Sequence, residues 1–270
     1  MTRHEWAAAS KGWEERADAF RRATMPVAMW MIDHTAPQPG QTVLDLAAGI
    51  GDTGFLAAEL IQPGGTLISS DLVPEMLAAA QRRADALGIT NARFRQIDAS
   101  QPIDLETASL DIVLCRFGYM LMADPENALR ETRRILRPGG RLALAAWGRA
   151  ADNRWSSLPI DLLLERGLIE PIEPGAGGQF YWGEEGVIAE HLENAGFVDY
   201  EVEPVGFTIR YPSVDAWWAT SRSMSIRAGR ARVDDPSELL AALADAAREW
   251  TADDGSITVP ASTWAAAATG

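Results

Sequence analysis

Gly49, Gly51 and Gly54 match the spacing G-x-G-x-x-G, which lets a backbone approach a bound cofactor closely. Asp71 follows this glycine loop by about twenty residues, where a carboxylate can accept hydrogen bonds from both hydroxyl groups of a ribose. The pattern predicts a site for an adenosine cofactor. Taken alone, it suits NAD as well as any other such cofactor.

Charges beside the loop distinguish between these cofactors. Asp45 ends the preceding apolar run and would lie among the loop amides, and Asp52 adds a second carboxylate where the next helix begins. Negative groups at that position repel a pyrophosphate, whereas they suit a ligand that carries an ammonium group. The loop is therefore poorly charged for a phosphate.

Four motifs occur in order across residues 40–147: DLAAGIG from Asp45, SDLVPEML from Ser70, QIDA from Gln96 and RILRPGGRL from Arg134. Their combination resembles the class I, Rossmann-like S-adenosylmethionine-dependent methyltransferases. Ala47 stands where that family's loop D-x-G-x-G-x-G has its first glycine. The segment DPENAL from Asp124, which leads into the last motif, is similar to small-molecule methyltransferases of ubiquinone and menaquinone biosynthesis.

The resemblance implies S-adenosylmethionine as the cofactor and S-adenosylhomocysteine as its product. The loop backbone would approach the methionine part, Asp71 would bind the ribose, and Asp98 would accept from the adenine amine. The implied cofactor-binding residues are Asp45, Ala47, Gly49, Gly51, Asp71, Leu72, Met76, Asp98, Ala99, Arg116 and Phe117. Leu72 and Met76 would pack on adenine, with a backbone contact from Ala99, while Arg116 and Phe117 would line the methionine side.

Three of these assignments have a purely structural alternative. Asp71 would serve equally as a helix N-cap, and Asp98 as a turn carboxylate. Arg116, at a strand end, would pair with a surface acid.

The elements that must position these residues follow from hydrophobic periodicity. Between residues 42 and 147, short apolar runs alternate with helical patterns, which is typical of β-α units on a parallel sheet. Strands are predicted at 42–46, 66–71, 92–97, 110–116 and 141–147, and helices at 53–61, 74–87 and 125–136. Residues 198–211 and the stretch from 256 predict two further strands.

The expected fold class is α/β, with a seven-stranded, mostly parallel Rossmann-like sheet, helices on both faces and an antiparallel last strand. We expect an N-terminal helical cap at 1–40, made of one or two helices, and a cofactor-binding core at 41–150. Lid or substrate segments are expected at 151–183 and 212–255, and the rest of the core sheet at 184–211 and 256–270. Proline and glycine predict an irregular excursion across residues 149–183.

All ten tryptophans lie outside residues 31–146, in or beside the segments added to the core. Such rings need a packing or ligand partner. Five aromatic residues are therefore candidates for lining an apolar acceptor site: Trp13, Tyr181, Trp182, Trp217 and Trp218. Simple anchoring of the added segments explains them equally well.

Composition excludes several kinds of site. The formal net charge of −14, without a basic stripe, disfavours nucleic acid and anionic membranes as partners. The single cysteine, Cys115, lies in an apolar run and provides neither a disulfide nor a thiolate cluster. The three histidines lack metal-ligand spacing, so no metal and no catalytic residue are predicted. Without an apolar leader or membrane span, a cytoplasmic protein is expected.

The predicted activity is methyl transfer from S-adenosylmethionine to an oxygen, nitrogen or carbon atom of a small, apolar or aromatic metabolite. One alternative is an NAD(P)-dependent oxidoreductase, although Lys11, the only lysine, forms no Y-x-x-x-K pair. Another is a cofactor-binding or regulatory protein of the same fold without catalysis.

Overall fold

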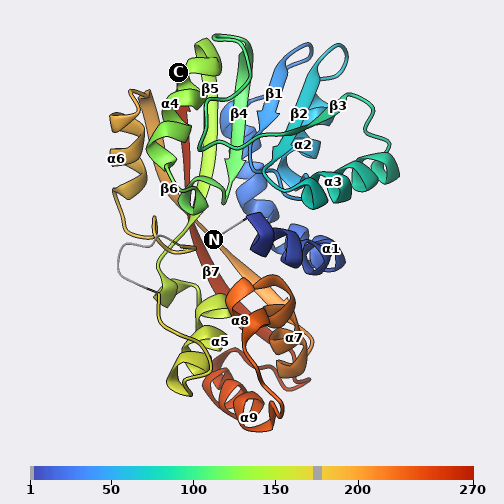
Figure 1. Cartoon of the computed structure of the whole chain (residues 1–270), viewed down its shortest axis with the longest axis vertical. Coiled ribbons are helices and arrows are strands. Elements are labelled where there is room, and N and C mark those ends of the chain that lie inside the picture. The colour runs from blue at the N-terminus through green and yellow to red at the C-terminus, as the bar shows by residue number, and fades with distance from the viewer. Residues whose placement is uncertain (1–2, 173–177) are drawn as a thin grey trace.

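The computed structural model describes residues 3–172 and 178–270, and these residues form the expected α/β fold (Figure 1). Seven strands pair in the order β3-β2-β1-β4-β5-β7-β6. They are β1 (Thr42–Asp45), β2 (Thr66–Asp71), β3 (Ala92–Gln96), β4 (Leu110–Arg116), β5 (Leu136–Trp147), β6 (Val198–Tyr211) and β7 (Ile257–Thr269). The first five strands pair in parallel, and β7 is antiparallel to both β5 and β6.

Helices surround this sheet and extend beyond it. The N-terminal segment is a single helix, α1 (Arg3–Thr35). The other helices are α2 (Asp52–Leu60), α3 (Pro74–Leu87), α4 (Pro125–Ile135), α5 (Arg154–Glu165), α6 (Val187–Asn194), α7 (Val214–Met224), α8 (Ile226–Arg230) and α9 (Ser237–Ala246). In Figure 1, α5, α7, α8 and α9 gather at the far end of β6 and β7, and the start of α1 lies between them and the sheet.

The start of one predicted strand is wrong, and one helix was not predicted. Strand β5 begins at Leu136, because Leu110 pairs with Leu136 and Ile112 with Arg141, so the intervening P-G-G residues bulge within the strand. The segment after β5 contains α5 where an irregular excursion was predicted, since Leu158 and its helically spaced neighbours are buried. Residues 173–177 of that excursion lie outside the described residues.

The central strands of the sheet, β1, β2 and β4, are buried on both faces, as their apolar sequences require. In β4, Ile112 and Leu114 pack with residues of α1 and α2, whereas Val113 and Cys115 pack on the opposite face with residues of α4 and α6. Cys115 is buried, as its apolar run predicts, and burial raises the pKa of its thiol. This core fixes the carboxyl ends of β1, β2 and β4, where the glycine loop begins.

We call the four helices at the end of β6 and the start of β7 the lid: α5, α7, α8 and α9. Two of them are joined by a hydrogen bond to a backbone carbonyl that a proline leaves unpaired. Pro159, inside α5, has no N–H for the carbonyl of Trp155, four residues earlier. The indole Nε1 of Trp217 on α7 donates to this carbonyl at 2.7 Å. The buried Trp217 ring also stacks on Tyr211, with centroids 5.4 Å apart. These contacts join α5, α7 and the end of β6 in one unit.

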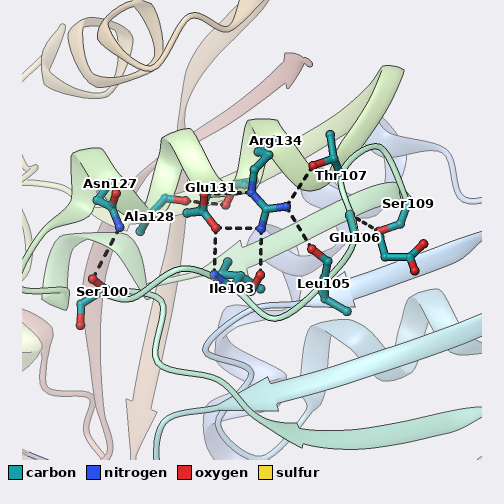
Figure 2. A network of polar contacts seen from close by, with 11 residues as sticks. Ser100, Ile103, Leu105, Glu106, Thr107, Ser109, Asn127, Ala128, Glu131 and Arg134 are labelled. Atoms are coloured by element: carbon teal, nitrogen blue, oxygen red, sulfur yellow. Dashed lines mark hydrogen bonds and ion pairs between the residues drawn. The ribbon is translucent and has the colours of Figure 1, made fainter.

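Arg134, the first arginine of the RILRPGGRL motif, is hydrogen-bonded to the loop that follows β3. Arg134 on α4 donates to the carbonyls of Ile103 and Leu105 at 2.8 and 3.0 Å, and Glu131 accepts from the Ile103 N–H at 2.8 Å (Figure 2). The hydrogen bond from Arg134 lowers the pKa of Glu131. The motif therefore positions the segment after β3, which carries Asp98.

Helix α1 meets the lid at a glycine. A Cβ on Gly12 would lie well inside van der Waals contact with the backbone carbonyl of Ser223, at the end of α7. We expect Gly12→Ala to lower the melting temperature, because overpacking costs about 1–3 kcal/mol and exceeds the helix-propensity gain of up to ~1 kcal/mol. Thermal unfolding followed by circular dichroism measures this change. In the control Gly206→Ala, where no atom lies within 4 Å of the added Cβ, the melting temperature should not fall.

Candidate functional site

The glycine loop joins β1 to α2 at the carboxyl edge of the parallel strands. Ala47, Gly49 and Gly51 have φ angles of 54°, 55° and 92°, in the left-handed region. A Cβ on Gly51 would collide with the Phe55 ring, whereas no atom lies within 4 Å of the Cβ position at Gly49. The loop is thus packed against α2 at Gly51 and open at Gly49, which leaves a side-chain-free approach to its backbone.

Asp45 is buried beneath this loop. Its Oδ2 accepts a hydrogen bond from the Gly54 N–H at 2.8 Å, and its side chain leaves no space for a Cβ at Gly54. Burial raises the pKa of Asp45 to about 7, against the opposing effect of the Gly54 hydrogen bond. Asp45 therefore ties the start of α2 to β1 and carries a charge that costs stability when the carboxyl ionises.

The raised pKa of Asp45 makes a prediction about stability. The folded protein keeps a proton that the unfolded chain has already lost, so stability falls as pH rises from 3.8 to about 7 and then levels off. We expect Asp45→Asn to melt several degrees above the wild type at about pH 8 and to lose this advantage near about pH 4. Melting curves across this range test the sign. Equal differences at all pH values would contradict it.

Asp71 links the glycine loop to β2 and α3. Its Oδ2 accepts from the Gly49 N–H and its Oδ1 from the Val73 N–H, each at 2.9 Å. Burial raises the pKa of Asp71. Each carboxylate oxygen keeps a further lone pair, so this side chain can brace the loop and still accept from a ligand hydroxyl.

The residues assigned to adenine pack against α1. Leu72 and Met76 belong to one apolar cluster with Ile50 of the glycine loop and with Ala17 and Trp13 of α1. The first half of α1 therefore covers the side of the loop that the resemblance assigns to the adenine ring.

Ion pairs hold this half of α1 in place on two sides. Glu14 pairs with Arg82 of α3 at 2.7 Å, and the hydrogen bond from Arg82 lowers the pKa of Glu14. Near the start of α1, Glu5 pairs with Arg230 of α8 at 2.6 Å. Helix α1 thus bridges the core and the lid over the glycine loop.

Asp98 follows β3 and is exposed, while its neighbour Ala99 is buried. The Oδ1 of Asp98 accepts from the N–H and the hydroxyl of Ser100, at 3.0 and 2.6 Å. This is the turn geometry of the structural alternative. A carboxylate has acceptor sites to spare, so the turn leaves the assignment to adenine as a prediction.

Arg116, at the end of β4, belongs to a buried charge network. Its Nη2 lies 3.4 Å from Oδ2 of Asp52, and Nη2 of Arg83 lies 2.7 Å from the other oxygen. Arg116 also donates to the Thr24 hydroxyl of α1, and burial lowers the pKa of its guanidinium. The inference that Asp52 leaves the start of α2 negatively charged is wrong, because two guanidinium groups share this one carboxylate.

Sequence reasoning missed an aromatic cluster beyond the ends of β4 and β5. Phe117 stacks on Trp147 with centroids 4.0 Å apart and planes 10° from parallel. Three further rings surround Trp147 at 4.9 to 6.4 Å: Phe20, Trp155 and Phe207. They come from α1, α5 and β6, so sequence spacing could not group them. The aromatic signal was present only as tryptophan enrichment in the added segments.

Among the aromatic residues predicted near the acceptor, Trp13 lies beside this cluster. Its ring meets Phe20 edge to face at 4.9 Å. Its Nε1 is buried and has no hydrogen-bond partner within the described residues. An indole N–H in this state has its hydrogen available for a bound molecule.

The other predicted acceptor residues lie elsewhere. Trp182 is fully buried and stacks on His191 at 4.3 Å, and Trp217 is buried in the lid contact with Trp155. Trp218 is nearly buried, whereas Tyr181 is exposed. Packing accounts for the buried rings, and a role in acceptor binding stays a prediction.

Histidine and carboxylate pairs occur away from the loop. His191 Nδ1 lies 2.6 Å from Glu126, and His34 Nε2 lies 3.5 Å from Glu201. Within the described residues, no three His, Cys, Asp or Glu side chains are grouped so that they could hold a metal ion. The helices of that same part of the chain include none with the length and apolar character needed to cross a membrane.

Comparison with known proteins places this site in a recognisable domain. A family described as methyltransferase domain matches residues 37–157, a range that contains the glycine loop, Asp71 and Arg116. The nocamycin O-methyltransferase of Saccharothrix syringae is 28% identical over 239 residues, which cover 84% of each protein. The demethylmenaquinone methyltransferase of Thermus thermophilus is 37% identical over 113 residues, 42% of this chain and 50% of that protein.

A solved structure shows the same fold. The YcgJ protein of Bacillus subtilis superposes with a TM-score of 0.61 at 21% identity, covering 90% of this chain and 97% of that one. The likeness therefore extends from the sheet to the segments that surround it.

Proposed function

We propose that this chain, whose residues 37–157 match a methyltransferase domain, is a class I, Rossmann-like S-adenosylmethionine-dependent methyltransferase. Its acceptor is an oxygen, nitrogen or carbon atom of a small apolar or aromatic metabolite. The main support for an apolar or aromatic acceptor is the aromatic cluster around Trp147, which lies at the edge of the sheet that bears the glycine loop. Ligands bind outside the carboxyl ends of the strands in open α/β sheets.

The residues present fit S-adenosylmethionine. The open backbone at Gly49 allows close approach, and Asp71 has acceptor capacity for ribose hydroxyls. The Asp52 network has two guanidinium groups for one carboxylate, so Arg116 is suited to the carboxylate of the methionine end. These assignments, with Asp45, Leu72, Met76, Asp98, Ala99 and Phe117, are proposals about cofactor contacts.

When bound, S-adenosylmethionine supplies a methyl group already activated by its sulfonium. The protein then has to align the acceptor and exclude water, which are both positioning tasks. Helix α1 and the lid are arranged to do this, because α1 lies against the loop residues and contacts α7 at Gly12. A general base is needed only for an acceptor atom that must lose its proton.

Titration calorimetry with S-adenosylmethionine, S-adenosylhomocysteine and NADH tests the cofactor site directly. We expect both adenosyl ligands to bind and NADH not to bind. Binding of NADH alone would favour the oxidoreductase alternative, which the relatives do not support. Transfer of a labelled methyl group to apolar and aromatic acceptors then tests catalysis, and adenosyl binding without any transfer would favour a non-catalytic protein.

The relatives suggest where to begin an acceptor screen. The names of two of them refer to nocamycin and to demethylmenaquinone as the molecules methylated by those proteins. A screen that starts with phenols, hydroquinones and enolic polyketide-like compounds therefore samples chemistry that suits the aromatic cluster.

A further inference from the structure

We propose that the acceptor is a planar aromatic molecule that stacks on Trp147 in the place now held by Phe117. This inference rests on the proposed function and narrows its acceptor to one class. Its basis is the geometry of the five rings that meet beyond β4 and β5, which we call the aromatic cluster: Phe20, Phe117, Trp147, Trp155 and Phe207.

The Phe117–Trp147 stack lies next to the cofactor loop. Phe117 follows Arg116, the last residue of β4, and its N–H donates to the carbonyl of Ala145 in β5 at 2.8 Å. The next residue, Gly118, approaches Ala47 so closely that an added Cβ would lie 2.9 Å from the Ala47 Cβ. The stack is therefore adjacent to the loop to which the methionine part of the cofactor is assigned.

Phe117 is held in an unfavourable backbone conformation. Its φ of 64° is in the left-handed region, which is rare for a bulky residue and costs free energy. Strain of this kind persists where the surroundings enforce it, and it concentrates at functional sites. A ligand ring that takes over the face of Trp147 would release Phe117 from the contact that helps to hold it there.

The five rings have the composition of a binding site for a flat apolar molecule. They come from α1, the residue after β4, β5, α5 and β6, so the core, the N-terminal helix and the lid each contribute at least one ring. The Arg116 guanidinium lies over two of these rings, 5.5 Å from the Phe117 centroid and 5.7 Å from that of Phe20. Aromatic faces favour a stacked planar partner over a saturated one of the same size.

A matched pair of probes tests the role of stacking. 2-Naphthol is planar, and trans-2-decalol has the same ring skeleton fully saturated. In the presence of saturating S-adenosylhomocysteine, we expect the wild type to bind 2-naphthol with a Kd below about 1 mM and to bind the decalol at least about tenfold more weakly. Calorimetry measures both affinities, and quenching of tryptophan fluorescence gives a second measure of 2-naphthol binding. Equal affinities, or no binding of 2-naphthol, would overturn the inference.

Two substitutions with opposite expected effects exclude a merely structural role. Trp147→Leu should reduce 2-naphthol affinity about tenfold and abolish the preference over the decalol. Phe117→Gly should increase 2-naphthol affinity, because it vacates the stack and relieves the backbone. If Trp147→Leu fails to fold, the Phe117→Gly result decides alone. Unchanged or weaker 2-naphthol binding by a folded Phe117→Gly variant would contradict the proposal.

A control and an independent measurement complete the design. Trp30 stacks on His34 at 3.7 Å, and its indole donates to Glu203 at 2.9 Å. Trp30→Leu keeps the ring contacts around Trp147 in place and should leave both probe affinities unchanged. Affinity for S-adenosylhomocysteine is measured on every sample. Failure of that binding in the wild type would refute the proposed function, whereas intact cofactor binding without a planar preference would refute only the stacking inference.

Discussion

Asp71→Asn is expected to weaken binding of S-adenosylhomocysteine at least ~100-fold, because two charge-assisted hydrogen bonds to the ribose are each worth about 1.5–3 kcal/mol. A second effect acts in the same direction. Asp71 accepts from the N–H groups of Gly49 and Val73, and the amide of asparagine would turn a donor toward one of them. The loop would then lose the brace that holds its backbone open to the cofactor.

Calorimetry with two ligands shows which part of the cofactor has lost its contact in the Asp71→Asn variant. S-Adenosylhomocysteine and 5′-methylthioadenosine share the ribose, and only the first has the amino-acid end, so Asp71→Asn should lose affinity for both. The matched control is Asp104→Ala, which removes a fully exposed carboxylate paired with Arg95 and should bind both ligands as the wild type does. A folded Asp71→Asn protein within threefold of wild-type affinity for either ligand would contradict the ribose assignment.

The sequence predicted the sheet well because its central parallel strands are buried on both faces. Strands such as β4 are continuous apolar runs that alternate with amphipathic helices, and this pattern is local. The position of Asp71 at the end of β2 followed from the same alternation. The glycine loop was recognisable because left-handed backbone, as at Gly49 and Gly51, favours that residue type.

The contacts that complete the site could not be predicted from spacing. Phe20 and Trp147 are 127 positions apart in the chain, and they meet only because α1 returns over the carboxyl edge of the sheet. Helix α5 was missed for a related reason. Pro159 disfavours a helix locally, because it leaves the carbonyl of Trp155 without a backbone donor. The Trp217 indole, far along the chain, donates a hydrogen bond to that carbonyl.

The sequence predicted a negative charge at the start of α2 from Asp52, and this prediction is wrong because the arginine partners of Asp52 are distant in sequence. As an isolated residue it makes the start of α2 negative, but Arg83 from α3 and Arg116 from β4 reverse this in the folded protein. Arg134, the first arginine of the RILRPGGRL motif, was recognised by resemblance. Its hydrogen bonds to the carbonyls of Ile103 and Leu105 could be found only in the structure.

Arg116→Met is expected to lower the unfolding free energy by roughly 3 kcal/mol and to weaken S-adenosylhomocysteine binding at least ~10-fold. The first effect arises because Asp52, buried with a 3% exposed side chain, keeps Arg83 but loses a second guanidinium. The second follows from the proposal that Arg116 receives the methionine carboxylate. Denaturant unfolding and calorimetry measure the two effects separately.

The double variant Asp52→Asn with Arg116→Met separates stability from recognition. Removing both partners of a buried ion pair is often neutral for stability, but Arg83 then keeps only the amide oxygen of the asparagine, so only part of the lost unfolding free energy should return. The affinity for S-adenosylhomocysteine should stay low, because no guanidinium at position 116 faces the methionine end, while 5′-methylthioadenosine should bind both variants nearly as well as the wild type. If the double variant regains S-adenosylhomocysteine affinity together with stability, Arg116 is a structural partner of Asp52 and the carboxylate of the cofactor binds elsewhere.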